Sequence, residues 1–125
     1  MQKKRILLID DEPDFTSLLK LTLEKSGAYE VREENRAEHA LAAATAFKPD
    51  LILLDVMMAN VQGGEVAAQL QADEMLKETP VVFLTAVVAK EEVKKRSGLI
   101  GGHPFIAKPT SPEQLMVSIE KYLGG

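Results

Sequence analysis

The feature that most constrains the fold of this chain is a series of short apolar runs that each stop at a polar residue. The run Leu51-Ile52-Leu53-Leu54 follows Pro49-Asp50 and stops at Asp55. Four apolar residues in succession are typical of a strand buried on both faces. The other runs are 5–9 before Asp10 and Asp11, 81–84 before Thr85, and 105–107 before Lys108. Since open α/β sheets bind ligands at the carboxyl ends of their strands, the pattern predicts a site there.

Length and composition limit the class of protein. A chain of 125 residues has the size of one domain, so we expect a single domain over residues 1–125. The net charge of -4 argues against direct binding of nucleic acid. The absence of cysteine excludes disulfides and zinc–sulfur sites and agrees with a reducing cytoplasm. The apolar run behind the basic start is too short for a signal sequence or a membrane span, so we expect a soluble cytoplasmic protein.

Helix-like patterns alternate with the strand-like runs. Four helices have clear apolar faces, formed by Phe15, Leu18, Leu19, Thr22 and Leu23; by Ala37, Ala40, Leu41, Ala44 and Phe47; by Val66, Ala67 and Leu70; and by Leu115, Met116, Ile119, Tyr122 and Leu123. A further helix near residues 89–97 has Val93 as its clearest apolar anchor. Five strand–helix pairs predict a single doubly wound α/β domain, with a five-stranded parallel sheet and five helices.

The polarity of the strands predicts their order. The central strands should be the three most apolar ones, around Leu8, Leu53 and Phe83. The alternating strand at 29–33 and the strand at 105–107, which follows a proline, should be edges. The resulting order is 2-1-3-4-5, in which the first and third strands flank the switch point. Asp10, Asp11 and Asp55 should converge there.

Converging carboxylates have a definite chemistry. Asp10, Asp11 and Asp55 would repel one another, so they need a cation or a shifted pKa. Oxygen ligands without His or Cys favour Mg²⁺, and an Asp neutralised by a metal can attack phosphorus as a nucleophile. Lys108 could then neutralise one phosphoryl oxygen, and Thr85 could donate a hydrogen bond to another. These residues predict a site for phosphoryl transfer.

Each of these residues also has an ordinary structural explanation. Asp10 and Asp11 could cap the first helix, Thr85 could be a turn residue, and Lys108 could be a solvated lysine. Asp55 alone could cap a loop. Four strand ends with suitable polar residues favour the site over these separate explanations.

The same motifs resemble the receiver domain of two-component response regulators over essentially the whole chain. They are Leu8-Ile9-Asp10-Asp11-Glu12-Pro13, then Leu53-Leu54-Asp55-Val56-Met57-Met58 with Gly63, then Phe83-Leu84-Thr85-Ala86, and Phe105-Ile106-Ala107-Lys108-Pro109. The resemblance implies a flavodoxin-like fold and a switch in phosphorelay signalling, not a stand-alone enzyme. Asp55 would accept a phosphoryl group from a sensor histidine kinase or a phosphotransfer protein, and the domain would catalyse only its own phosphorylation and dephosphorylation.

The resemblance also implies a role for individual residues around Asp55. Mg²⁺ would be bound by Asp10, Asp11, Asp55 and the backbone carbonyl of Met57, with Asp10 acting largely through a bound water. The residues implied to contact the phosphoryl group or to switch with it are Thr85, Ala86, Lys108 and Phe105.

Two further expectations concern the edges of this site. The resemblance implies a cis bond between Lys108 and Pro109. By the same resemblance, Met57 and Val87 would border the path of the water that hydrolyses the aspartyl phosphate. Both are apolar and cannot orient that water, so we expect slow dephosphorylation.

The chain departs from the family pattern in two segments. Residues 59–62 replace a common proline-containing loop, and Gly101-Gly102-His103-Pro104 replaces an acidic segment on the face that usually engages partners. His39 and His103 are interpreted as surface histidines. The sequence leaves the output partner open, admits a homodimer on phosphorylation, and fits both a stand-alone regulator and the receiver part of a longer one.

Two alternative functions belong to other classes. A phosphatase of the haloacid dehalogenase type also uses an Asp nucleophile with Mg²⁺, but Asp55-Val56-Met57-Met58 lacks the second aspartate that it needs. A receiver-like module that binds partners without phosphorylation would not need the complete set of Asp10, Asp11, Asp55, Thr85 and Lys108.

Overall fold

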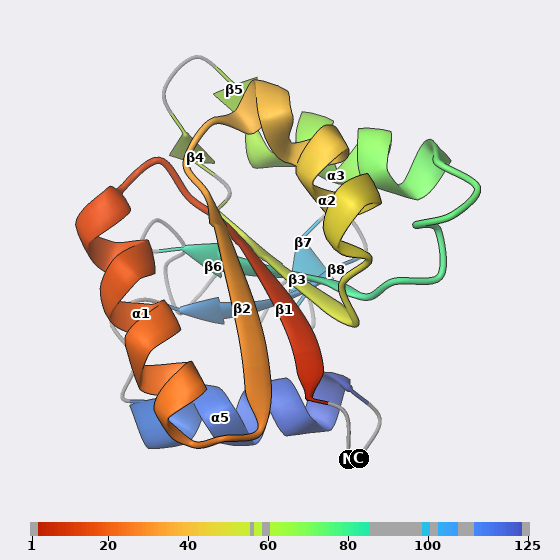
Figure 1. The fold of residues 1–125 in the computed structure, drawn as a ribbon. Helices are drawn as coiled ribbons and strands as arrows, with labels where there is room; N and C mark the ends of the chain where they lie inside the picture. The colour runs from red at the N-terminus through yellow and green to blue at the C-terminus, as the bar shows by residue number, and fades with distance from the viewer. Residues whose placement is uncertain are drawn as a thin grey trace.

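A central sheet covered by helices on both faces forms the core of the computed structural model, which describes residues 3–55, 57–58, 61–85, 99–100, 103–107 and 112–123 (Figure 1). The elements are β1 (Lys4–Ile9), α1 (Pro13–Lys25), β2 (Tyr29–Glu34), the 3₁₀ turn η1 (Ala37–His39), α2 (Ala40–Phe47), β3 (Leu51–Leu54), β4 (Met57–Met58), β5 (Val61–Gln62), α3 (Gly63–Ala72), β6 (Val81–Thr85), β7 (Leu99–Ile100), β8 (His103–Ala107) and α5 (Pro112–Tyr122). The helix expected near 89–97 lies outside the described residues. Among those described, no helix is long and apolar enough to cross a membrane.

The sheet has the predicted doubly wound, flavodoxin-like order. Its strands lie in the order β2-β1-β3-β6-β8, and every neighbouring pair in this series is parallel. β1 and β3 are in register, with Ile9 beside Leu54, so the residues that follow both strands emerge at the same edge. β4 and β5 form a separate antiparallel pair beyond this edge. The predicted order is confirmed for the first four strands, β8 takes the place predicted for the fifth, and β7 adds a sixth strand to the sheet.

The prediction of two edge strands is right on one side and wrong on the other. β2 is an edge of the sheet, and the N–H of Val31 donates to a carboxylate oxygen of Glu24 in α1 at 3.0 Å. β8 is flanked by β7, which pairs antiparallel with its residues His103 and Pro104. The proline does not prevent this pairing, because alternate residues of an antiparallel strand point their N–H groups away from the partner.

The two faces of the sheet carry two separate hydrophobic cores. Figure 1 shows α1 and α5 on one face and α2 and α3 on the other. Alternate residues of β1 and β3 belong to different cores, since successive side chains of a strand point to opposite faces. The core under α2 and α3 includes Ala40, Ala43, Ala44, Val66, Ala67 and Leu70, and the core under α1 and α5 includes Leu19, Leu23, Leu115 and Ile119. The predicted inner faces of α2, α3 and α5 are confirmed.

The predicted inner face of α1 needs one correction. Leu19 and Leu23 are buried, but Leu18 is 65% exposed. Thr16 is fully buried in its place, at 0% exposure. A polar side chain is stable there because its hydroxyl is hydrogen-bonded, so the hydrophobic pattern alone misplaces the stripe. α1 ends at Lys25, two residues before Gly27, whose φ of 81° is typical of the residue after a helix.

Candidate functional site

The carboxyl edge of the sheet brings the ends of β1 and β3 together. The N–H of Asp55 donates to the carbonyl of Ile9 at 2.9 Å, which joins the residue after β3 to the last residue of β1. Asp10 follows directly after Ile9, as Asp55 follows Leu54. Asp10 and Asp55 are 3% and 5% exposed, so both carboxylates leave the core at one point of the edge.

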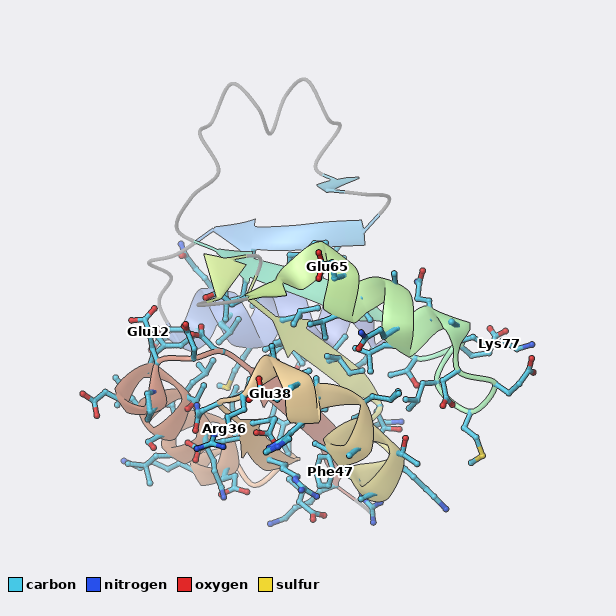
Figure 2. All side chains as sticks on the ribbon, turned by 90° about the horizontal axis from the view of Figure 1, so that it is seen from above. Glu12, Arg36, Glu38, Phe47, Glu65 and Lys77 are labelled. Atoms are coloured by element: carbon cyan, nitrogen blue, oxygen red, sulfur yellow. The ribbon has the colours of Figure 1, made fainter. Side chains whose placement is uncertain are left out.

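Four carboxylates form one cluster at this edge. One oxygen from each of Asp10, Asp11, Glu12 and Asp55 lies within 4.8 Å of all the others. The predicted convergence of the three aspartates is confirmed. Sequence reasoning misses Glu12, although three consecutive acidic residues after a strand are a signal for it. Glu12 lies directly before the start of α1. Figure 2 labels it on the side of the molecule opposite to Lys77.

The explanation by helix capping does not account for the cluster. The residue at the N-cap of α1 is Glu12, and no side chain makes a capping hydrogen bond there. Asp10 instead accepts the N–H of Glu12 on its Oδ1 at 3.1 Å, which bends the loop between β1 and α1. Its backbone is tied to the next strand, since its N–H donates to the carbonyl of Glu34 at 3.1 Å. The acidic loop, residues 10–12, is thus shaped by a hydrogen bond within it and by a hydrogen bond to β2.

The donor set of the cluster suits a hard divalent cation. Carboxylate oxygens are the ligands that Mg²⁺ prefers. Opposite ligands of a Mg²⁺ ion are about 4.1 Å apart, which is close to the 4.8 Å within which the four oxygens lie. Like charges at this spacing repel one another, and a cation relieves the repulsion. The residues that could hold the ion are therefore Asp10, Asp11, Glu12 and Asp55.

The remaining strand ends arrive at the same edge. β6 lies beside β3, and its last residue, Thr85, is level with Ala107, the last residue of β8. The backbone of Phe105 lies beside Phe83 in the same pair of strands. Met57 belongs to β4, just beyond Asp55. The other predicted site residues, Ala86, Val87, Lys108 and Pro109, lie outside the described residues.

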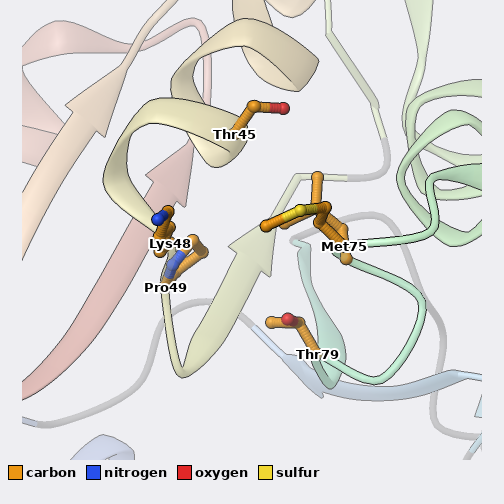
Figure 3. Close-up of a pocket in the computed structure, with 6 residues that line it drawn as sticks. Thr45, Lys48, Pro49, Met75 and Thr79 are labelled. Atoms are coloured by element: carbon orange, nitrogen blue, oxygen red, sulfur yellow. The ribbon is translucent and has the colours of Figure 1, made fainter.

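A pocket lies at the opposite, amino edge of the sheet. It has a volume of about 120 Å³ and is lined by Thr45, Lys48, Pro49, Met75, Leu76 and Thr79 (Figure 3). The hydroxyl of Thr45 already donates to the carbonyl of Leu41 at 2.8 Å. Lys48 is the one ionisable residue in this lining. This pocket therefore offers fewer ionisable side chains than the cluster at the carboxyl edge.

Comparison with known proteins identifies the family. Residues 6–120 match the response regulator receiver domain family. The chain is 38% identical over 124 residues to the phosphate regulon transcriptional regulatory protein PhoB of Pseudomonas aeruginosa, covering 98% of this chain and 53% of that protein. It is 34% identical over 122 residues to the polar-differentiation response regulator DivK of Brucella anthropi, covering 97% of both.

The fold has equally clear relatives among solved structures. The chemotaxis protein CheY4 of Vibrio cholerae superposes with a TM-score of 0.84 at 27% identity, covering 97% of this chain and 99% of that one. The chain spans about half the length of the transcriptional regulator and nearly the full length of the other two relatives. With its acidic cluster at the carboxyl edge of a doubly wound sheet, the chain belongs to the receiver domain family of two-component response regulators.

Proposed function

We propose that this chain is switched by phosphorylation of Asp55, with Mg²⁺ bound by the acidic cluster. Receiver domains are regulatory parts of phosphorelays, and they bind Mg²⁺ through acidic residues. The observation that carries the proposal is the burial of Asp55 at a central strand end, within 4.8 Å of three other carboxylates. Such a carboxylate is held rigidly and becomes a usable nucleophile once a cation offsets the charges around it.

The proposed reaction moves one phosphoryl group. A carboxylate oxygen of Asp55 attacks the phosphorus of a phosphohistidine on a histidine kinase or a phosphotransfer protein. A new P–O bond forms, the P–N bond breaks, and the imidazole leaves with the bonding electron pair and takes up a proton. The Mg²⁺, when bound, offsets the negative charge that gathers on the phosphoryl oxygens. The site residues Asp10, Asp11 and Glu12 would hold it, with the carbonyl of Met57 as a further ligand.

The roles of the remaining residues are part of the same proposal. Thr85 and the backbone of Ala86 would bind phosphoryl oxygens, and Lys108 would neutralise one of them. Movement of Thr85 toward the new charge would let the ring of Phe105 follow. Supporting this, the last residue of β6 and the last residue of β8 are level at the edge where Asp55 lies. A homodimer on phosphorylation is one way in which such a switch could act.

The test uses acetyl phosphate as a small phosphodonor. The protein is incubated with acetyl phosphate and Mg²⁺, and its intact mass is measured. We expect one added phosphoryl group, which Asp55→Asn eliminates. Asp50→Asn is the matched control, because Asp50 precedes the same strand, β3, at its opposite end. An adduct that survives Asp55→Asn, or its absence in the folded wild type, contradicts the proposal; the second result would favour a module that binds partners without phosphorylation.

We also propose that the phosphorylated state is long-lived. Hydrolysis requires a water in line behind the phosphorus, and Met57 and Val87 would border its approach with apolar side chains. Orienting a nucleophile can be worth several kcal/mol, and each ~1.36 kcal/mol is about tenfold in rate. The double variant Met57→Asn with Val87→Glu supplies polar groups and should lose phosphate faster. Equal rates, or a slower double variant, contradict this proposal.

A further inference from the structure

A side-chain amide from another part of the chain also contacts the acidic loop, residues 10–12. Asn35, in the segment that follows β2, donates from its Nδ2 to the backbone carbonyl of Asp10 at 2.8 Å. The same nitrogen donates to the hydroxyl oxygen of Thr16 at 2.9 Å. An amide nitrogen carries two protons, so it can serve both acceptors at once. Asn35 therefore joins the residue that begins the acidic loop to the first turns of α1.

The second contact of Asn35 is itself buried and fixed. Thr16 is 0% exposed, and its hydroxyl donates to the carbonyl of Pro13 at 3.2 Å. Its backbone N–H donates to the carbonyl of Glu12 at 3.1 Å. The series of contacts from Asn35 through Thr16 thus ends at Glu12, the last acidic residue of the loop. Asn35 thus contacts Asp10 directly, and it reaches Glu12 through Thr16, whose backbone N–H is bonded to Glu12.

We propose that Asn35 is a positioning residue, which sets the distance of Asp10, Asp11 and Glu12 from Asp55. The inference rests on the proposed function, since it assigns to Asn35 the geometry of the same cation site. The physical need for such a tie comes from charge. The carboxylates of the cluster repel one another, and repulsion drives a loop apart unless its backbone is fixed. Without the amide, the loop would have to bind a cation and order itself at the same time.

The direct test is the affinity for Mg²⁺, measured by isothermal titration calorimetry with MgCl₂. Partners that orient metal ligands typically change the affinity by tenfold or more, so we expect Asn35→Ala to raise the Kd for Mg²⁺ about tenfold. Asn35→Asp separates position from charge. It has nearly the same shape and adds a negative charge, which by attraction alone would tighten binding. It also removes both donors, so the inference predicts weaker binding despite the charge.

A second pair of variants tests the path through Thr16. Thr16→Val removes the hydroxyl at nearly constant volume, and we expect a Kd raised about threefold, since the direct bond from Asn35 to Asp10 remains. Thr16→Ser keeps the hydroxyl and should restore the wild-type Kd. Thr22→Val is the matched control, because the hydroxyl of Thr22 donates to the carbonyl of Leu18 at 2.9 Å in the same helix, away from the loop. In the double variant Asn35→Ala with Thr16→Val, the two losses should not add.

Urea unfolding without cation accompanies each titration and shows which variants are folded. A purely structural role for Asn35 would lower the stability and leave the Kd of the folded protein unchanged, and that result overturns the inference. So does an Asn35→Asp variant that binds Mg²⁺ as tightly as the wild type. If Asn35→Ala does not fold, Asn35→Asp and Thr16→Val decide the question. Failure of the wild type to bind Mg²⁺ is a different result, because it refutes the proposed function itself.

Discussion

The two ends of the central sheet differ in the charged groups that they bring together. At the carboxyl edge, four carboxylates of one sign are brought within 4.8 Å of one another. At the amino edge, Arg5 of β1 is surrounded by acceptors. Its backbone N–H donates to the carboxylate of Asp50 at 2.8 Å, and its guanidinium donates to the carbonyl of Phe47 at 2.9 Å. The carboxyl edge gathers several carboxylates, and the amino edge joins one arginine to several acceptors.

The details of the amino edge show that it supports the fold. The guanidinium of Arg5 lies 5.6 Å from the centre of the Phe47 ring and 3.8 Å from the carboxylate of Glu30. The backbones of Arg5 and Asp50 are also joined, since the N–H of Asp50 donates to the carbonyl of Arg5 at 2.8 Å. These contacts join β1 to the end of α2 and to the start of β3. β1 therefore begins with contacts that support the fold, and the acidic cluster follows directly after its end.

The largest expected effect separates the edges by their response to Mg²⁺. A cation that binds only the folded state raises the free energy of unfolding by about 2.7 kcal/mol at a hundredfold excess over its Kd. We expect this gain for the wild type, measured by urea unfolding with and without Mg²⁺. Asp55→Asn should lose most of it, and Asp50→Asn should keep it. An equal gain in both variants would mean that the cation does not bind at the carboxyl edge.

The next effect concerns Arg5. Arg5→Ala removes a hydrogen bond and a cation–π contact, worth about 1–2 kcal/mol together. The pair with Glu30 adds little, because the side chains are 46% and 53% exposed. We expect the free energy of unfolding to fall by this amount while phosphorylation by acetyl phosphate keeps its rate. Arg5→Lys keeps the charge and should recover only part of the loss. A slower phosphorylation of the folded variant would show that contacts at the amino edge also affect the reaction at the carboxyl edge.

A smaller effect of opposite sign is expected at the carboxyl edge. Asp11→Asn removes one of four like charges, so without Mg²⁺ the free energy of unfolding should rise, on the order of 1 kcal/mol. Asp11 is half-buried, and the gain should shrink in 1 M salt, where the screening length is about 3 Å. Urea unfolding at low and high salt measures both quantities. A loss of stability in Asp11→Asn would show that repulsion does not dominate this edge.

The smallest effect is a pH dependence at the amino edge. Burial, and then the negative charge of Glu120, raise the pKa of Tyr29 above its ordinary value of about 10. The folded state therefore holds this proton more tightly than the unfolded state. The resulting stability is fully present below about pH 10 and is lost as the pH rises through the folded pKa. Above pH 10, the free energy of unfolding of Tyr29→Phe should fall less steeply with pH than that of the wild type, as followed by circular dichroism. Identical alkaline profiles would contradict this assignment.

Much of the fold could be predicted from the pattern of apolar runs. Strands buried on both faces need helices on both sides, and their polarity orders them, which is why the series β2-β1-β3-β6-β8 was predictable. Errors occurred where a neighbour, not the local pattern, decides burial or pairing. Leu18 fits an apolar stripe but is exposed, and β8 gains an additional partner in β7. Neither fact has a local signature.

The candidate site divides in the same way. Asp10, Asp11 and Asp55 follow strand ends, and parallel strands must bring such residues to one edge, so the sequence by itself determined that these three aspartates meet. The place of Glu12 in the cluster and the bonds from Asn35 to Asp10 and Thr16 emerged only in the tertiary structure. The reason is physical. Strand order fixes which loops meet, but the hydrogen bonds that shape a loop depend on side chains from another part of the chain, at distances that no spacing encodes.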